Sequence, residues 1–535
     1  MSDGIKMNGR TRSKRFWIIL VSVIIGVPVF VILVLLMVIL IKAAVISTPQ
    51  CNIGILNNAN TAGVTDDNIS ARAGRLAGAL RIETVSYDAN NQNKSEFVVL
   101  RNYLETSFPL IHASDFVERH IVNDYSLLYK VSGSEPGKLP YLLTSHMDVV
   151  PAPPANWKYP PFGGDIVDGE IWGRGAIDDK GGVMAIMEAL EYWLSLGARP
   201  KRTFYIGFGH DEEIGGHRGA FHIAIKLKSL GVNKLDFVMD EGLFITDKIL
   251  PGVSKPAALI GVSEKGYLDL KLEVTGKLQH ASYPPNESPI GILGRAVGNI
   301  EKRKQPVYFG TGPEADTFHY VASSTDYGIR IFYANMWIFG SLMASFMEKD
   351  PLQSTVVKTS TGLTMFNSGI KDNIIPEVAT ALVNHRVHPG QTIEQVIQED
   401  RISISDGKVK ISVESRIDPH PVSPFGPDAL VFQTISTSVY QTYENIVVAP
   451  CVFIAATDTV HYLQFSNKVY RFFPTKVTPD DVSRYHGDNE RIAIEDYKLM
   501  VDFYFRFMQN SDLVFDLAPD DEQPVLTRSQ NEDEL

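Results

Sequence analysis

Acidic and imidazole side chains follow three apolar stretches of the chain, and these residue types can bind metals or move protons. The stretches 141–145, 203–208 and 235–239 run into His146 with Asp148, into His210 through Glu213, and into Asp240 with Glu241. If the stretches are neighbouring buried strands, their carboxyl ends share the sheet edge where α/β proteins bind ligands. Each His or Glu pair alone is more often an ordinary polar group, but their combination on one edge favours a site. Aspartate, glutamate and histidine together are a donor set for Zn²⁺.

A fourth acidic pair, Asp178 and Asp179, follows a glycine-rich turn and precedes a predicted helix over 182–196. The apolar residues of 182–196 fall on one helical face. The pair could simply cap this helix, because carboxylates accept hydrogen bonds from exposed backbone N–H groups. Alternatively, it joins the acidic edge.

The elements that must position these residues predict an α/β fold. Apolar runs alternate with helical patterns to about residue 260, which is typical of a catalytic domain with a largely parallel sheet. The segment 267–275 then alternates apolar and charged residues, as a half-exposed strand of an antiparallel sheet does. With a helix over 290–302 and a strand over 378–386, we expect an inserted α+β domain at 263–385. The catalytic domain is then 66–262 and 386–512, ending in a helix over 493–509.

The N-terminal segment 16–41 has no charged residue over 26 positions. As a helix it is about 39 Å long, against about 30 Å of bilayer hydrocarbon. A cleaved signal peptide has an apolar core of only about 7–15 residues, so the pattern favours one transmembrane signal-anchor. No other segment is long enough to span, which excludes a transporter.

The charged flanks predict the orientation of this anchor. Five basic residues precede residue 16, and only Lys42 follows closely, so residues 1–15 should stay cytoplasmic. Residues 42–65 then form a stalk, and the rest is lumenal or extracellular in the secretory pathway, lysosome, vacuole or cell surface. Sequons at Asn68, Asn93 and Asn286 agree weakly with this type II topology. Residues 513–535 form an acidic tail.

Composition limits the partners. The 535 residues carry a net charge of −12, which argues against nucleic acid, since phosphate neutralisation needs clustered basic residues. The two cysteines, Cys51 and Cys451, exclude a disulfide-rich scaffold. They could form one disulfide or stay as two buried thiols.

Three motifs together resemble the dinuclear zinc exopeptidases that include aminoacylase, carboxypeptidase G and carboxypeptidase S. The carboxypeptidase S branch, which also holds N-fatty-acyl-amino-acid synthase/hydrolases, is the most similar. The motifs are Ser145-His146-Met147-Asp148, Trp172-Gly173-Arg174-Gly175 continuing to Asp179-Lys180, and Gly209-His210-Asp211-Glu212-Glu213. The resemblance covers about residues 70–510.

The resemblance implies two Zn²⁺ per subunit. Its first site would use His146, Asp178 and Asp240, and its second Asp178, Glu213 and His486, with Asp178 bridging. Asp148 would orient His146 through the second ring nitrogen. A cis peptide between Asp178 and Asp179 is also implied.

Amide hydrolysis by such a pair of ions needs a base for the attacking water. The resemblance assigns this role to Glu212, which would pass the proton to the departing amine. The inserted domain, a ferredoxin-like lid and dimerisation domain, would supply His280 for the oxyanion, across a possible homodimer. It would also supply Asn373 for substrate contact and Arg386 for the substrate carboxylate. Thr457 resembles a further substrate-binding residue.

An apolar run at 333–346, rich in aromatic residues and methionine, lies within the inserted domain. Helical core or a dimer face is the simpler interpretation; the alternative is a wall for a fatty-acyl chain or a lipid surface. The sequence therefore predicts a membrane-anchored zinc amidohydrolase whose substrates are N-acyl amino acids or blocked dipeptides. The competing hypothesis is an inactive, membrane-tethered binding or scaffold relative, but all six expected site residues are present.

Overall fold

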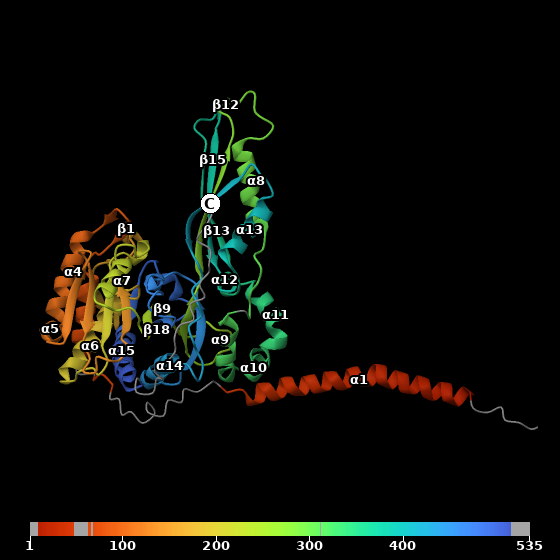
Figure 1. Ribbon diagram of the computed structural model, residues 1–535, viewed down its shortest axis with the longest axis horizontal. Coiled ribbons are helices and arrows are strands. Elements are labelled where there is room, and N and C mark those ends of the chain that lie inside the picture. Colours follow the sequence, from red (N-terminus) through yellow and green to blue (C-terminus); the bar gives the residue numbers. More distant parts are fainter. Residues whose placement is uncertain (1–8, 48–62, 66–67, 311, 515–535) are drawn as a thin grey trace, which may run out of the picture.

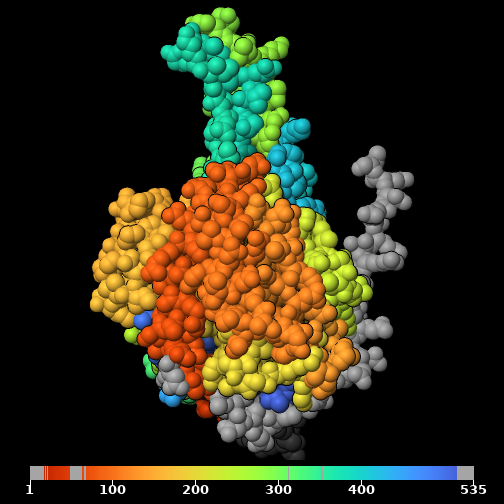
Figure 2. Space-filling view, turned by 90° about the vertical axis from the view of Figure 1, so that its left-hand side faces the viewer, coloured from red at the N-terminus to blue at the C-terminus, as the bar shows by residue number. Residues whose placement is uncertain are grey.

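The computed structural model describes residues 9–47, 63–65, 68–310 and 312–514. The predicted cytoplasmic tail, most of the stalk with Cys51, and the acidic C-terminal tail therefore lie wholly or mainly outside the described residues. A first domain holds the large sheet, a second domain projects from it, and helix α1 (Gly9–Val45) extends away from both (Figures 1 and 2).

The large sheet has eight strands and is mixed. Its central strands β18, β9, β5 and β8 run parallel, while β10 and β4 join them in antiparallel fashion. Its order is β17 (Val447–Phe453), β10 (Ala257–Glu264), β18 (Val469–Val477), β9 (Val238–Thr246), β5 (Tyr141–His146), β8 (Phe204–Gly209), β4 (Ser126–Val131) and β3 (Val117–Val122). The three apolar stretches predicted as buried strands are β5, β8 and β9, and they are adjacent.

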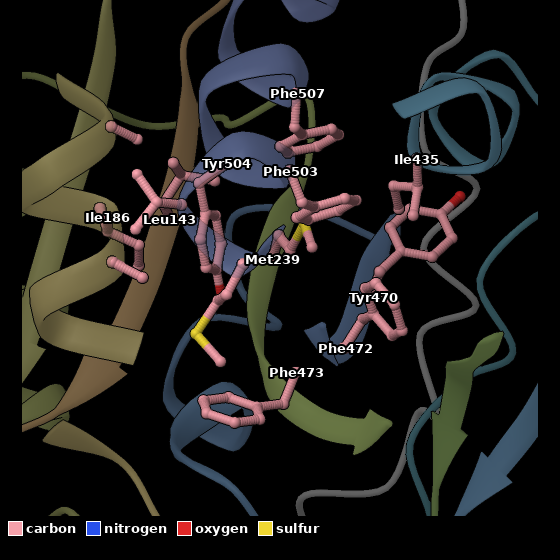
Figure 3. Packing of buried hydrophobic residues seen from close by; sticks show 14 of the residues in the cluster. Leu143, Ile186, Met239, Ile435, Tyr470, Phe472, Phe473, Phe503, Tyr504 and Phe507 are labelled. Carbon is pink, nitrogen blue, oxygen red and sulfur yellow. The ribbon is translucent and has the colours of Figure 1, made fainter. Parts of the chain in front are cut away.

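Helices cover both faces of this sheet because its buried strands are apolar on both sides. Leu143 packs with α6 and α15, whereas its neighbour Leu142 faces α7 in a separate cluster. Figure 3 shows the larger cluster, where Leu143 and Ile186 meet aromatic residues of β18 and α15. The covering helices are α6 (Lys180–Ser195), α14 (Leu430–Thr442) and α15 (Ile494–Val514) on one face and α7 (Ala220–Ser229) on the other.

Further elements complete the first domain. They are α3 (Ile69–Leu80), α4 (Lys94–Ser107), α5 (Pro109–Ala113), the β1–β2 pair (Ser86–Asp88, Asn91–Gln92) and a small sheet of β6 (Asp165–Val167), β7 (Glu170–Trp172) and β19 (Arg491–Ala493).

The second domain is an antiparallel four-stranded sheet with α8 (Pro289–Lys302) and α13 (Ile393–Ile404) on one face. Its strands are β13 (Ser360–Ser368), β15 (Val378–Val387), β11 (Gly266–Thr275) and β16 (Lys410–Ile417). The alternation over 267–275 is confirmed, since Leu268, Leu270, Leu272 and Val274 are all fully buried. This sheet continues to Ile417, past the boundary expected at residue 385. A short pair, β12 (Gln279–His280) and β14 (Ile374–Ile375), lies at the far end of this domain (Figure 1).

Four helices between α8 and β13 lie outside the hydrophobic core of the second domain. They are α9 (Glu314–Val321), α10 (Tyr327–Tyr333), α11 (Met336–Met347) and α12 (Pro351–Val357). Helix α9 packs on β17 of the first domain, and α10 packs on the end of α1. We call this segment, residues 314–357, the helical insert. Within the described residues, α1 holds the one helix segment long and apolar enough to cross a membrane, Ser22–Val45.

Candidate metal centre and substrate site

The acidic edge predicted from sequence forms at the carboxyl ends of β5, β8 and β9. His146 is the last residue of β5, and Glu241 lies in β9. Glu212 and Glu213 begin a 3-10 turn after β8 rather than ending a strand. Two loops complete the edge, one carrying Asp178 before α6 and one carrying His486 before β19.

Two groups of potential metal ligands share one residue. In the first, His146 Nε2 lies 3.0 Å from Asp178 Oδ1 and 3.2 Å from Glu241 Oε1. In the second, His486 Nε2 lies 3.1 Å from Asp178 Oδ2 and 3.1 Å from Glu213 Oε2. Each group is compact enough to hold one metal ion. Since Asp178 turns one oxygen to each group, its carboxylate is placed to bridge two ions.

The structure places Glu241, not Asp240, beside His146. The Glu241 carboxylate is the one that reaches the His146 ring, with Oε1 at 3.2 Å from Nε2, and β9 is irregular here, since its register with β18 shifts between Asp240 and Leu243. Asp240 instead turns one carboxylate oxygen back to accept the Glu241 N–H at 2.9 Å. The expectation that Asp240 completes the first group does not match this geometry, and Glu241 takes that position.

Asp148 organises both halves of the edge. Its buried carboxylate accepts the backbone N–H groups of Glu212 and Glu213 at 3.0 and 3.3 Å. The His146 Nδ1 atom lies 2.9 Å from the Asp148 carbonyl oxygen and 3.4 Å from its carboxylate. With Nδ1–H donating to that carbonyl, Nε2 presents its lone pair to the ligand group.

Glu212 stands beside the first group without joining it. Its Oε2 lies 3.9 Å from His146 Nε2. Burial raises the pKa of the Glu212 carboxyl well above its usual range, with the neighbouring acids Glu241 and Glu213 adding to the effect. A buried carboxyl group of high proton affinity next to a metal site suits a proton carrier.

Two buried acidic side chains, Asp179 and Glu490, fix the loop that carries Asp178 through hydrogen bonds. Asp179, joined to Asp178 by a cis peptide bond as expected, accepts hydrogen bonds from the Ser145 hydroxyl and the His146 N–H. Glu490, fully buried, accepts the N–H groups of Gly175, Ile177 and Asp178 at 3.0, 2.8 and 3.2 Å. It also pairs with Arg174 at 2.7 Å. These bonds fix the direction of the bridging carboxylate.

The charge balance of the edge favours bound cations. Four carboxylates, those of Asp178, Glu212, Glu213 and Glu241, face only two imidazoles. Burial raises the pKa of Glu213 to about 7, and the hydrogen bonds that the His486 ring donates to Asp178 and Glu213 raise the pKa of His486 to about 10. Glu213 Oε1 is buried without a hydrogen-bond partner among the described residues. Carboxylate and imidazole donors with an unmatched buried oxygen fit two divalent ions.

The predicted residues at the tip of the second domain lie away from this edge. His280 is exposed in β12 and pairs with Ile374 of β14, and the N–H of the next residue donates to the Asn373 carbonyl at 2.9 Å. His280 and Asn373 are thus together, but they are not brought to the metal centre of their own chain (Figure 1).

Arg386 and Thr457 lie where the two domains join. Arg386, in β15, stacks its guanidinium 4.7 Å from the ring centre of Tyr267. Thr457 is buried and donates its hydroxyl to Glu264, the last residue of β10, at 2.8 Å. Glu264 also pairs with the buried Arg471 at 2.6 Å. Thr457 therefore belongs to a buried network of polar side chains at the end of β10, next to the start of the second domain.

Glu241 and Glu490 were missed by sequence reasoning for different reasons. For Glu241, the family resemblance assigned the ligand position to its neighbour Asp240, and no pattern in the sequence distinguished the two. Glu490 is more than 300 residues from the loop it holds, so no local pattern could signal its role.

Comparison with known proteins gives a consistent result. The family model "Peptidase family M20/M25/M40" matches residues 142–510. The N-fatty-acyl-amino acid synthase/hydrolase PM20D1 of Xenopus tropicalis is 43% identical over 437 residues, covering 82% of this chain and 85% of that protein. The PM20D1 protein of Homo sapiens is 40% identical, covering 84% and 88%.

Two further similarities extend the comparison. Probable carboxypeptidase S-like 2 of Dictyostelium discoideum is 38% identical, covering 82% of this chain and 85% of that protein. Among solved structures, an M20 family metallo-carboxypeptidase of Sulfolobus solfataricus superimposes with a TM-score of 0.61 at 18% identity, covering 84% and 100% of the two chains. At that identity the superposition establishes the fold.

Proposed function

Since the chain belongs to peptidase family M20/M25/M40, we propose that it is a membrane-anchored, zinc-dependent hydrolase of N-fatty-acyl amino acids. The observation that carries the proposal is the pair of ligand groups sharing Asp178. The names of relatives at 40–45% identity support the substrate class. The single long apolar helix near the N-terminus supports the anchor.

In this proposal His146, Asp178 and Glu241 hold one Zn²⁺, and Asp178, Glu213 and His486 hold the other. The two ions, when bound, would polarise the amide carbonyl and lower the pKa of a water molecule. Glu241 replaces Asp240 in the ligand set expected from sequence, on the geometry described above. Asp148, Asp179 and Glu490 keep the ligands in place.

Glu212 moves the proton. Its carboxylate takes a proton from the attacking water and delivers it to the amide nitrogen, so that the C–N bond breaks to give a carboxylate and a free amine. Arg386 would bind the carboxylate of the amino-acid half through a bidentate contact. The condensation of fatty acid and amino acid is the same path in reverse.

Because His280 is exposed and remote from its own centre, we propose that it acts in the site of a second copy. There it would stabilise the oxyanion, with Asn373 beside it. A homodimer is thus part of the proposal.

A blocked dipeptide is the second candidate substrate, favoured by the similarity to carboxypeptidase S-like proteins. The test is hydrolysis by the zinc-loaded full chain of a mixed panel of N-fatty-acyl amino acids and blocked dipeptides, followed by mass spectrometry. Faster turnover of long acyl chains is expected. Exclusive cleavage of dipeptides would make the protein a carboxypeptidase, and cleavage of neither would reject the proposed activity.

A further inference from the structure

The helical insert presents an apolar surface next to the end of α1. Helix α11 (Met336–Met347) contains no charged residue. Helix α10 lies beside the last turns of α1 (Figure 1), and Trp337 at the start of α11 also contacts α1. The sequence of this segment was compatible with core, dimer face or lipid contact, and its position in the structure separates these possibilities.

Specific contacts fix the insert to α1. The buried Asn335 donates its side-chain amide to the Ile39 carbonyl at 3.0 Å. The Lys42 ammonium lies 5.4 Å from the centre of the Trp337 ring. The Tyr327 hydroxyl reaches the Leu40 carbonyl at 3.5 Å. These contacts fix the position of α11 relative to residues 39–42 of α1, the helix that would cross the membrane.

The outward face of α11 is also mainly apolar, although it includes the exposed Ser341 and Ser345. Ala344 and Met347 are buried, as core packing requires. On the other side, Ile338, Leu342 and Phe346 recur at four-residue spacing and are exposed. Trp337 and Phe346 leave 57% and 56% of their surface uncovered. A helix with apolar residues on both faces needs an apolar partner on each face. Among the described residues, none covers the outward face of α11.

The position along α1 identifies that partner. The apolar part of α1, Ser22–Val45, has 24 residues, about 36 Å as a helix against about 30 Å of hydrocarbon. Contacts at residues 39–42 therefore place α11 at the end of the span on the side of the folded domains. Tryptophan, tyrosine and lysine gather at this depth in membrane proteins. The charged residues Glu348 to Asp350 follow α11 directly, where the chain would return to water.

We propose that the outward face of α11 lies in the interface of the bilayer that α1 crosses, with Trp337, Leu342 and Phe346 among the lipid acyl chains. The surface takes a phospholipid bilayer as its partner. It holds the catalytic domain against the membrane, where amphiphilic N-fatty-acyl substrates would also partition. The inference rests on the anchoring by α1 in the proposed function.

Quenching of tryptophan fluorescence by brominated phospholipids tests the contact. The full chain carrying Trp17→Phe is reconstituted in phosphatidylcholine vesicles with bromines near either the headgroup or the chain end. The bromines near the headgroup should quench more strongly, and Trp337→Phe should remove most of that quenching. Trp193→Phe, a change in the buried core at α6, should leave it unchanged.

Equal quenching with and without Trp337, or none at all, would overturn the proposal. So would conversion of a dimer to a monomer by Leu342→Glu/Phe346→Glu without any lipid quenching of Trp337, because the face would then be an interface between copies.

Activity gives an independent measurement. In Leu342→Glu/Phe346→Glu, hydrolysis of an N-oleoyl amino acid embedded in the vesicles should fall about tenfold, since charged side chains leave the interface. Hydrolysis of a short, water-soluble N-acetyl amino acid should stay unchanged, which also shows that the variant folds. Equal loss on both substrates would contradict membrane docking. If wild type hydrolyses neither, the proposed function fails, while the quenching result still decides the docking.

Discussion

At the scale of single residues, the site depends on how Asp178 divides its two oxygens. One faces His146 and Glu241, and the other faces His486 and Glu213. Asp178 is the residue that the two ligand groups share, because His146 faces its Oδ1 atom and His486 faces its Oδ2 atom. The ligand set is therefore a property of one loop conformation as much as of residue types.

The choice between Glu241 and Asp240 can be tested by metal content. We expect Glu241→Gln to retain about one ion per subunit instead of two, because the first group loses a charged ligand. Asp240→Asn is the matched control and should keep both, since its carboxylate contacts the Glu241 N–H instead. Mass-spectrometric metal analysis after dialysis measures both. The reverse pattern would restore Asp240 as the ligand.

Glu490 is expected to act through the Asp178 loop. In Glu490→Gln, Arg174 loses its buried partner and three N–H groups lose a full carboxylate, which should destabilise the fold by about 3 kcal/mol. Metal affinity should also fall about 10–100-fold, as for other groups that orient ligands. Glu495→Gln, an exposed change on α15, is the control for thermal unfolding and metal titration. Unchanged metal affinity in a folded Glu490→Gln protein would argue against this role.

At the scale of elements, the strand ends explain why the site could be found from sequence. The central strands β5, β8 and β9 are buried on both faces, so their sequences are apolar runs, and the polar residues that end each run mark the sheet edge. The helix over 182–196 and the alternating strand over 267–275 were confirmed for the same reason: periodicity records which face is buried.

Other elements could not be predicted because their partners are distant in sequence. The strand β16 pairs with β11 across about 140 residues, so nothing near residue 385 indicated that the second sheet continues. The helical insert has helical periodicity, but its packing on β17 and α1 follows only from the three-dimensional fold. The role of Thr457 in holding Glu264 was hidden for the same reason.

The position of His280 predicts complementation between copies. Glu212→Gln and His280→Ala subunits should each be nearly inactive. If His280 acts across the dimer, mixing them equally should restore about a quarter of the wild-type activity, because a heterodimer keeps one intact site and half of the dimers are mixed. Turnover after co-expression measures this. A mixture no more active than its parts would place His280 outside the partner's site.

At the level of the whole molecule, the proposed anchoring by α1 predicts a membrane topology for the folded domains. We expect the domains to be lumenal or extracellular, because the basic residues cluster before the apolar run. Protease added to sealed microsomes should remove only the N-terminal tail and leave a protected product of nearly full length. Asn68, Asn93 and Asn286 should be accessible to glycosylation, which a glycosidase shift reports. Digestion of the domains from outside would reverse the orientation.

The acidic net charge limits the partners of the protein but carries little information about its membrane topology. It argues against nucleic acid as the main partner, but it does not distinguish an anchored enzyme from an unanchored one. In our proposal, membrane attachment depends instead on α1 and on the apolar face of α11. Of the two cysteines, Cys451 is buried in β17, and Cys51 lies outside the described residues.

In the proposed function, Glu212 moves a proton beside a two-metal centre that it does not help to form. The most direct test is turnover of an N-oleoyl amino acid by Glu212→Gln together with its metal content. We expect this variant to bind two ions per subunit and its kcat to fall by about 10²–10⁴-fold, as for loss of a general base. Loss of an ion from this variant, or turnover close to that of the wild type, would contradict it.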